Sequence, residues 1–166
     1  MANRKVMELG EECLRQICKP VNKFDLRLKI LLKDMADTMY KANGVGLAAP
    51  QVGILRRVVV MDVGDDNGLI EMINPEVIAT EGAVEDTEGC LSLPGRVAYV
   101  VRPEKATVRY FDRNGNPCEL TGEGLLARCI CHECDHLDGV LYIDKMEREL
   151  TREEIEELNR GEDEEE

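Results

Sequence analysis

Aromatic residues are scarce in this sequence, which has no tryptophan and only two phenylalanines and four tyrosines among 166 residues. Its hydrophobic core must therefore be mainly aliphatic. Long apolar runs are also missing, and none approaches the roughly 18 residues of a membrane-spanning helix. The first ten residues, MANRKVMELG, lack the apolar stretch that a secretory signal requires. These absences predict a cytoplasmic protein without a membrane segment.

Positive charge is in short supply as well, because 21 basic residues face 34 acidic ones and give a net charge of −13. Residues 146–166 hold eleven acidic residues and three arginines, a net charge of −8. Such an acidic chain has no electrostatic reason to bind nucleic acid directly. The length fits a single domain, which we expect to span residues 1–160. Residues 161–166, GEDEEE, are expected to form a disordered acidic tail.

The seven cysteines are an odd number, and a chain of this size needs no disulfide to fold. Without an export signal, the thiols are expected to stay reduced in the cytosol. Each cysteine is therefore either a small core residue or a candidate metal ligand.

Hydrophobic periodicity predicts a helix from Phe24 to Tyr40 and a second helix from Thr121 to Asp138. A capping box formed by Thr151 and Glu154 predicts the start of a short third helix. Strand-like runs occupy residues 57–63, 68–73, 97–102, 106–111 and 116–120. Strands bracketed by helices in this order indicate an α+β domain rather than parallel β-α-β units.

The only two histidines of the chain, His132 and His136, stand four residues apart in the second predicted helix. Residues at this spacing share one helix face, so both imidazoles can reach one metal ion. Glu133 lies beside them and completes an HExxH pattern, which is typical of metal hydrolases. A hydrolytic metal site needs a third protein ligand and leaves one position open.

Cys129 shares the histidine face but cannot be that third ligand. It lies seven residues from His136, a rise of about 10.5 Å along a helix, whereas ligands of one ion lie within about 4 Å of one another. Cys129 can line the pocket only. Cys131 and Cys134 are rotated off the metal face.

The third ligand must then come from a distant segment, and the remaining candidates are Cys13, Cys18, Cys90 and Cys118. Cys90 has a slight advantage, because Gly89 permits close backbone approach and Pro94 ends the run. The residues alone leave all four open.

Three segments together resemble the signature motifs of the peptide deformylase family, and they follow the family's order. They are GVGLAAPQ at residues 44–51, EGCLS at residues 88–92 and HECDH at residues 132–136. The resemblance implies small, mostly antiparallel sheets packed around a central metal-binding HExxH helix. It also implies removal of the formyl group from nascent chains that begin with formyl-methionine, with release of formate.

By this resemblance Cys90, His132 and His136 would bind one divalent ion, typically Fe(II), which zinc, nickel or cobalt can replace. Glu133 would take a proton from water and pass it to the departing amine. The donors to the developing oxyanion would be the side-chain amide of Gln51 and the backbone N–H of Leu91.

The resemblance further assigns substrate contacts. Val45, Gly46 and Gly89 would contact the peptide backbone, which pairs with both segments like an added strand. Leu125 and Cys129, on the face of the metal helix, would line the pocket for the methionine side chain. Ordinary core packing explains Leu125 equally well.

Two positions depart from the commonest family pattern. Cys131 stands where glutamine is usual, off the metal face. Arg128 lies one turn before His132 and must either reach solvent or pair with an acid, because an unpaired buried charge is costly. Asp135 faces away from the metal and is either the ion-pair partner of Arg102 or an ordinary exposed polar residue.

Two other functions compete with this prediction. A zincin-type protease would need a downstream glutamate or histidine as third ligand, and no histidine follows His136. A catalytically silent metal-stabilised module is disfavoured because every catalytic position is filled. The expected partners are nascent polypeptides at the ribosome, and the expected state is a monomer.

Overall fold

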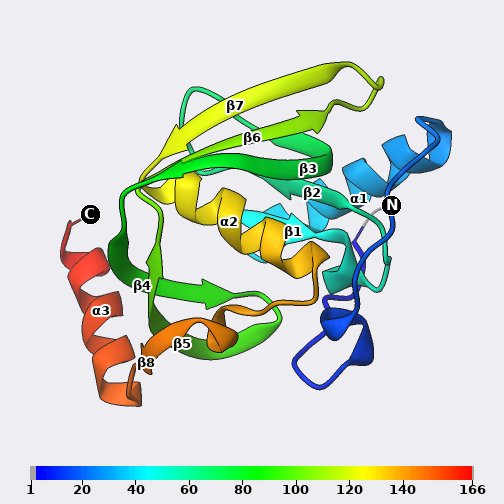
Figure 1. The fold of residues 1–166 in the computed structure, drawn as a ribbon. Coiled ribbons are helices and arrows are strands. Elements are labelled where there is room, and N and C mark those ends of the chain that lie inside the picture. The colour runs from blue at the N-terminus through cyan, green and yellow to red at the C-terminus, as the bar shows by residue number, and fades with distance from the viewer. Residues whose placement is uncertain (1–2, 166) are drawn as a thin grey trace.

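Two antiparallel sheets lie on either side of one central helix, α2 (Leu125–Leu137), in the computed structural model, which describes residues 3–165 (Figure 1). The larger sheet has the strand order β1-β2-β3-β6-β7, and the smaller has the order β4-β5-β8. The larger sheet consists of β1 (Gly46–Ala48), β2 (Val58–Met61), β3 (Ile70–Glu81), β6 (Lys105–Phe111) and β7 (Pro117–Glu123). The smaller consists of β4 (Val84–Cys90), β5 (Leu93–Arg102) and β8 (Met146–Glu149). The predicted α+β class and central helix are confirmed.

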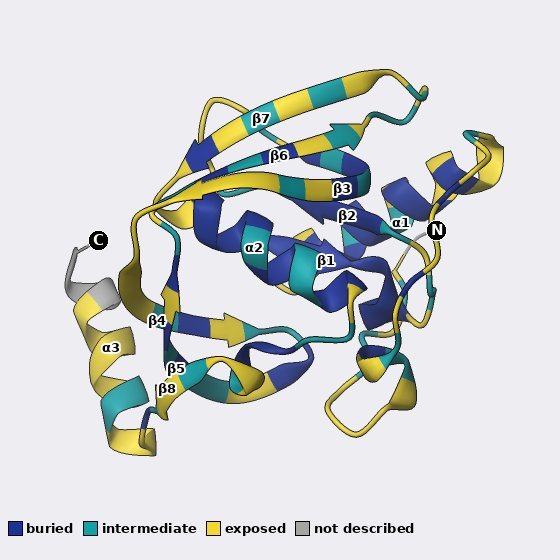
Figure 2. Cartoon of the chain, viewed as in Figure 1, coloured by how far each residue is buried: buried dark blue, intermediate teal, exposed yellow. Residues whose placement is uncertain are grey.

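The core is built on strand β2, whose residues are buried on both faces. Val58 and Val60 pack against helix α1 (Leu26–Lys41), whereas Val59 and Met61 pack toward α2. Side chains of a strand alternate between its two faces, so consecutive apolar residues here serve two helices. Figure 2 shows both helices as largely buried where they meet this sheet. The sheet therefore holds α2 rigidly from one side.

Helix α1 matches the predicted helix within two residues at its start. The Asp25 carboxylate accepts a hydrogen bond from the Leu28 N–H at 3.1 Å and caps its first turn.

No helix within residues 3–165 has the length and hydropathy that crossing a membrane requires.

The second helix was predicted to start at Thr121, but α2 starts at Leu125, because residues 121–123 continue strand β7. A Cβ added at Gly122 would lie 2.6 Å from Leu126 Cγ, so the strand end packs directly under the helix. Gly124 then takes a positive φ of 59°, which few other residues adopt readily, and the chain turns into α2. Strands β1, β4 and β8 were not predicted. They are short, or, like β4, exposed at a sheet edge with an acidic sequence.

Helix α3 spans Arg152–Glu165 and so includes residues 161–165 of the segment that was expected to be a disordered tail, whereas Glu166 lies outside the described residues. Its start follows the predicted capping box. The Glu154 N–H donates to Thr151 Oγ1 at 3.2 Å, and the Thr151 N–H donates to Glu154 Oε1 at 3.0 Å. Glutamate has a good helix propensity, so a helix nucleated in this way can propagate through the acidic residues.

Candidate metal centre and cleft

Cys90, at the end of β4, meets the two histidines of α2. One ligand atom from each of Cys90, His132 and His136 lies within 4.8 Å of the other two. Cys90 Sγ and His136 Nε2 are 3.3 Å apart. Burial lowers the pKa of His136 well below its usual range, which favours the neutral imidazole that binds metals. Two imidazoles and one thiol fit a divalent transition metal with an open coordination position.

Glu88 orients His132 from behind and was assigned no role in the sequence analysis. Its Oε2 accepts a hydrogen bond from His132 Nδ1 at 2.6 Å, which leaves Nε2 of that ring as the free nitrogen. Burial alone would raise the pKa of Glu88, but hydrogen bonds from His132 and Arg102 outweigh it and lower the pKa to about 2. Glu88 lies two residues before Cys90, a spacing that shares one strand face and could have indicated it.

Arg128 was expected either to reach solvent or to pair with an acid, and the structure shows the second: it is buried and paired with Glu88. Its guanidinium donates to Glu88 Oε1 at 3.0 Å and to the carbonyls of Val100 at 2.9 Å and Val84 at 2.8 Å. Arg102 also donates to Glu88, at 3.0 and 2.7 Å. The Glu88 carboxylate and the two carbonyl groups therefore join the small sheet to the metal helix.

Asp135 pairs with Arg102, the first of its two alternatives, with Arg102 Nη1 2.7 Å from Asp135 Oδ2, and Lys145 Nζ lies 3.0 Å from the same oxygen. Cys131 is half-buried and lines a separate cavity with Asp135, away from the metal ligands. Its unusual identity therefore leaves the metal ligands untouched.

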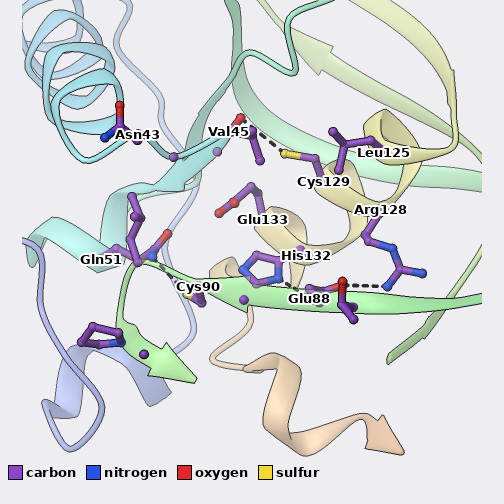
Figure 3. Close-up of a pocket in the computed structure, with 17 residues that line it drawn as sticks. Asn43, Val45, Gln51, Glu88, Cys90, Leu125, Arg128, Cys129, His132 and Glu133 are labelled. Atoms are coloured by element: carbon purple, nitrogen blue, oxygen red, sulfur yellow. Dashed lines mark hydrogen bonds and ion pairs between the residues drawn. The ribbon is translucent and has the colours of Figure 1, made fainter. Parts of the chain in front are cut away.

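Glu133 projects into the cleft from α2 (Figure 3). Its side chain is 4% exposed, and its Oε1 has no hydrogen-bond partner among the described residues. Burial raises the pKa of Glu133 to about 7. A carboxyl group that titrates near neutrality can both accept and return a proton.

Gln51 lies opposite, in the short 3-10 helix η2 (Ala49–Val52) that follows β1. Its Oε1 accepts from the Ala48 N–H at 2.9 Å, which fixes the amide orientation. Its Nε2 donates to Ser92 Oγ at 3.1 Å and toward Cys90 Sγ at 3.4 Å. The amide donor is thus held beside the thiol.

These residues surround a cavity of about 450 Å³ between β1 and β4. It is lined by ten of the eleven predicted site residues: Val45, Gly46, Gln51, Gly89, Cys90, Leu91, Leu125, Cys129, His132 and Glu133. His136 lies behind them, against Cys90. As expected, Cys129 lies beside the centre, with its Sγ 3.6 Å from the Val45 carbonyl oxygen.

Comparison with known proteins places the chain among well-defined relatives. The family model described as polypeptide deformylase matches residues 3–152. The chain is 55% identical, over 156 residues, to the peptide deformylase of Caldicellulosiruptor bescii, covering 94% of this chain and 93% of that protein. The counterpart from Caldanaerobacter subterraneus is 54% identical over 156 residues, covering 94% of this chain and 97% of that protein.

Solved structures show the same likeness. The crystal structure of a Legionella pneumophila peptide deformylase superposes with a TM-score of 0.85 at 52% identity, covering 87% of this chain and 86% of that one. The Thermotoga maritima structure gives a TM-score of 0.85 at 43% identity, covering 88% and 99%.

Proposed function

The chain belongs to the polypeptide deformylase family, and on that premise we propose that the cavity between β1 and β4 is its catalytic centre. The protein removes the N-formyl group from the formyl-methionine of nascent polypeptides and releases formate. The observation that carries the proposal is the group of Cys90, His132 and His136, with the buried Glu133 beside it.

Cys90, His132 and His136 would hold one divalent ion, and we assign Fe(II), with zinc, nickel or cobalt as substitutes. Family members depend on a metal, and the donor set suits a transition metal. When bound, the ion acts as a Lewis acid that activates water and polarises the formyl carbonyl. Glu88 holds the His132 ring in the orientation that this ligand role needs.

Glu133 would carry the proton. Its unpartnered Oε1 and raised pKa allow it to accept a proton from the attacking water and then deliver it to the departing amine. One carboxyl group would therefore act as base and then as acid.

Two donors would stabilise the developing oxyanion. The Gln51 amide is oriented by Ala48 and Ser92, and Leu91 lies in the turn directly after Cys90. Fixed donors of this kind stabilise charge that appears only in the transition state.

The peptide would enter as an added strand, because β1 and β4 are both edge strands. We assign backbone contacts to Val45 and Gly46 on one wall and to Gly89 on the other. Leu125 is 53% exposed and lines the same cavity as Cys129, which supports a role in the methionine pocket.

Substituting alanine for Gly46 and for Gly89 is expected to cause different kinetic defects. A methyl group at Gly46 would clash with the Glu133 carboxylate and lie 2.8 Å from Cys129 Sγ, whereas at Gly89 it would meet Arg96 O at an ordinary 3.4 Å. Gly46→Ala is therefore expected to lower kcat by about 10²-fold, the cost of a displacement near 1 Å. Gly89→Ala should keep its fold, metal content and kcat and raise the KM for formyl peptides. Steady-state kinetics of the pair tests this, and a parental kcat in Gly46→Ala would contradict it.

Hydrolysis of formyl-Met-Ala-Ser, followed by detection of formate, tests the proposed function. The expected products are formate and the intact tripeptide with a free amine. Cleavage of a peptide bond would indicate a protease instead, and no reaction with the metal-loaded protein would indicate a binding module.

The identity of the metal predicts a difference in air stability. Iron bound with a thiolate is open to oxidation, whereas nickel resists it, so the iron form should lose activity in air and the nickel form should keep it. Activity is followed over hours after loading each metal without oxygen. Equal air stability of the two forms would argue against iron in this geometry.

We also propose that the protein acts as a cytoplasmic monomer that meets nascent chains at the ribosome by diffusion, or through a face other than its acidic C-terminal segment. The acidic segment 146–166 offers no counterion release on RNA. Light scattering should give the 18.7 kDa of one chain, and a dimer mass would refute the monomer.

A further inference from the structure

Two backbone hydrogen bonds join the N-terminal segment to the segments that carry the proposed oxyanion donors. The Met7 N–H donates to the Gln51 carbonyl oxygen at 2.7 Å, and the Leu9 N–H donates to the Ser92 carbonyl oxygen at 2.9 Å. In Figure 3 the pale blue N-terminal ribbon passes beside the turn that holds Gln51. Residues 7–9 therefore bridge the two turns.

The helix η2, which holds Gln51, and the turn at residues 91–92 are connected to different sheets. Gln51 follows β1 of the larger sheet, and Leu91 and Ser92 form the turn between β4 and β5 of the smaller one. The Gln51 Nε2–Ser92 Oγ bond is a second link between them, at 3.1 Å. The distance between the two donors thus depends on how the sheets are held at this point.

The N-terminal segment is itself anchored on both sides of residues 7–9. On one side Arg4 forms an ion pair with Asp34 of α1 at 2.9 Å. On the other, Leu14 is 1% exposed and packs with Leu93 of β5 in the core of the smaller sheet. A segment fixed at both ends can hold the two carbonyl groups that its N–H groups bind, those of Gln51 and Ser92, at a constant separation.

We propose that Met7 and Leu9 are positioning residues, whose backbone N–H groups set the spacing between the Gln51 and Leu91 donors. The inference rests on the proposed function, because it matters only if those donors face the oxyanion. Such donors act at about 2.7–3.1 Å from the developing charge, and a shift near 1 Å costs about 10²-fold in rate.

Replacing single backbone amides with esters tests the proposal, because an ester removes the N–H and otherwise only weakens the preceding carbonyl as an acceptor. The native Cys13 allows a synthetic thioester of residues 1–12 to be ligated to residues 13–166 without changing the sequence. Esters at Met7 and Leu9 are compared with an ester at Glu8, whose N–H has no acceptor among the described residues. The semisynthetic all-amide chain is the parent.

The Met7 and Leu9 esters are expected to lower kcat by about 10- to 100-fold, with KM within twofold of the parent. Metal content should be unchanged, and the Glu8 ester should match the parent. In a Gln51→Ala background the Met7 ester should cause no further loss, since the donor it positions is gone.

A parental kcat in both esters would overturn the proposal. So would an equal loss in the Gln51→Ala background, or a loss of metal or fold, each of which would indicate a general structural role. An all-amide parent that releases no formate would instead refute the proposed function.

Discussion

Glu133→Ala is expected to lose about 10²–10⁴-fold in turnover, the usual effect of removing a general acid–base group. The side chain lies in the cleft without a hydrogen-bond partner on Oε1 among the described residues, and burial raises its pKa to about 7. It is not one of the three clustered ligand atoms, so the variant should keep its metal and its fold. Metal analysis and circular dichroism are measured with kcat on formyl-Met-Ala-Ser.

Glu133→Gln is the matched control for volume, because it keeps the shape of the side chain but cannot carry the proton. It should be as inactive as the alanine variant. A metal-loaded variant of either kind with near-parental turnover would remove Glu133 from the mechanism.

Cys90→Ala is expected to bind the metal more than about 100-fold more weakly, since even partners behind the ligands contribute 10- to 100-fold. Cys90 Sγ is the only thiol in the group of close ligand atoms found among residues 3–165. Metal content after gel filtration, by atomic emission, measures the loss. Activity should fall with the metal.

Three other cysteine variants serve as controls: Cys13→Ala, Cys18→Ala and Cys118→Ala. Cys18 is buried in the core between the larger sheet and α2, and Cys118 lies on β7. Neither belongs to the group of close ligand atoms. Each control should retain one metal per chain. Equal metal content in all four variants would place the third ligand elsewhere. Cys90→Ser is less decisive, because a hydroxyl group can still coordinate weakly.

The histidine pair could be predicted from the sequence because helical spacing is local. His132 and His136 lie on one face of α2 whatever surrounds the helix. The same reasoning rejected Cys129 as a ligand, and the structure places it at the cavity wall. Choosing Cys90 among four thiols needed the family resemblance, because tertiary packing of β4 against α2 brings it there.

Other features were out of reach for the same reason. Gly124 and the packing of Gly122 under Leu126 delay the start of α2, and no periodic pattern records such a contact. The role of Glu88 depends on β4 being a strand, and its acidic, exposed sequence concealed that. The pairing of Arg128 required knowing where Glu88 lies.

The shared carboxylate of Glu88 also sets the order in which this chain can tolerate substitutions over evolution. If Arg128 is replaced by an apolar residue, Glu88 keeps two hydrogen bonds from Arg102 and remains neutralised. If Glu88 is replaced first, the guanidinium of Arg128, 9% exposed, loses the one ion-pair partner that it has among the described residues, a loss that costs about 3–5 kcal/mol in buried pairs. Lineages can therefore gain or lose the arginine while the acid stays, but the reverse path passes through an unstable intermediate.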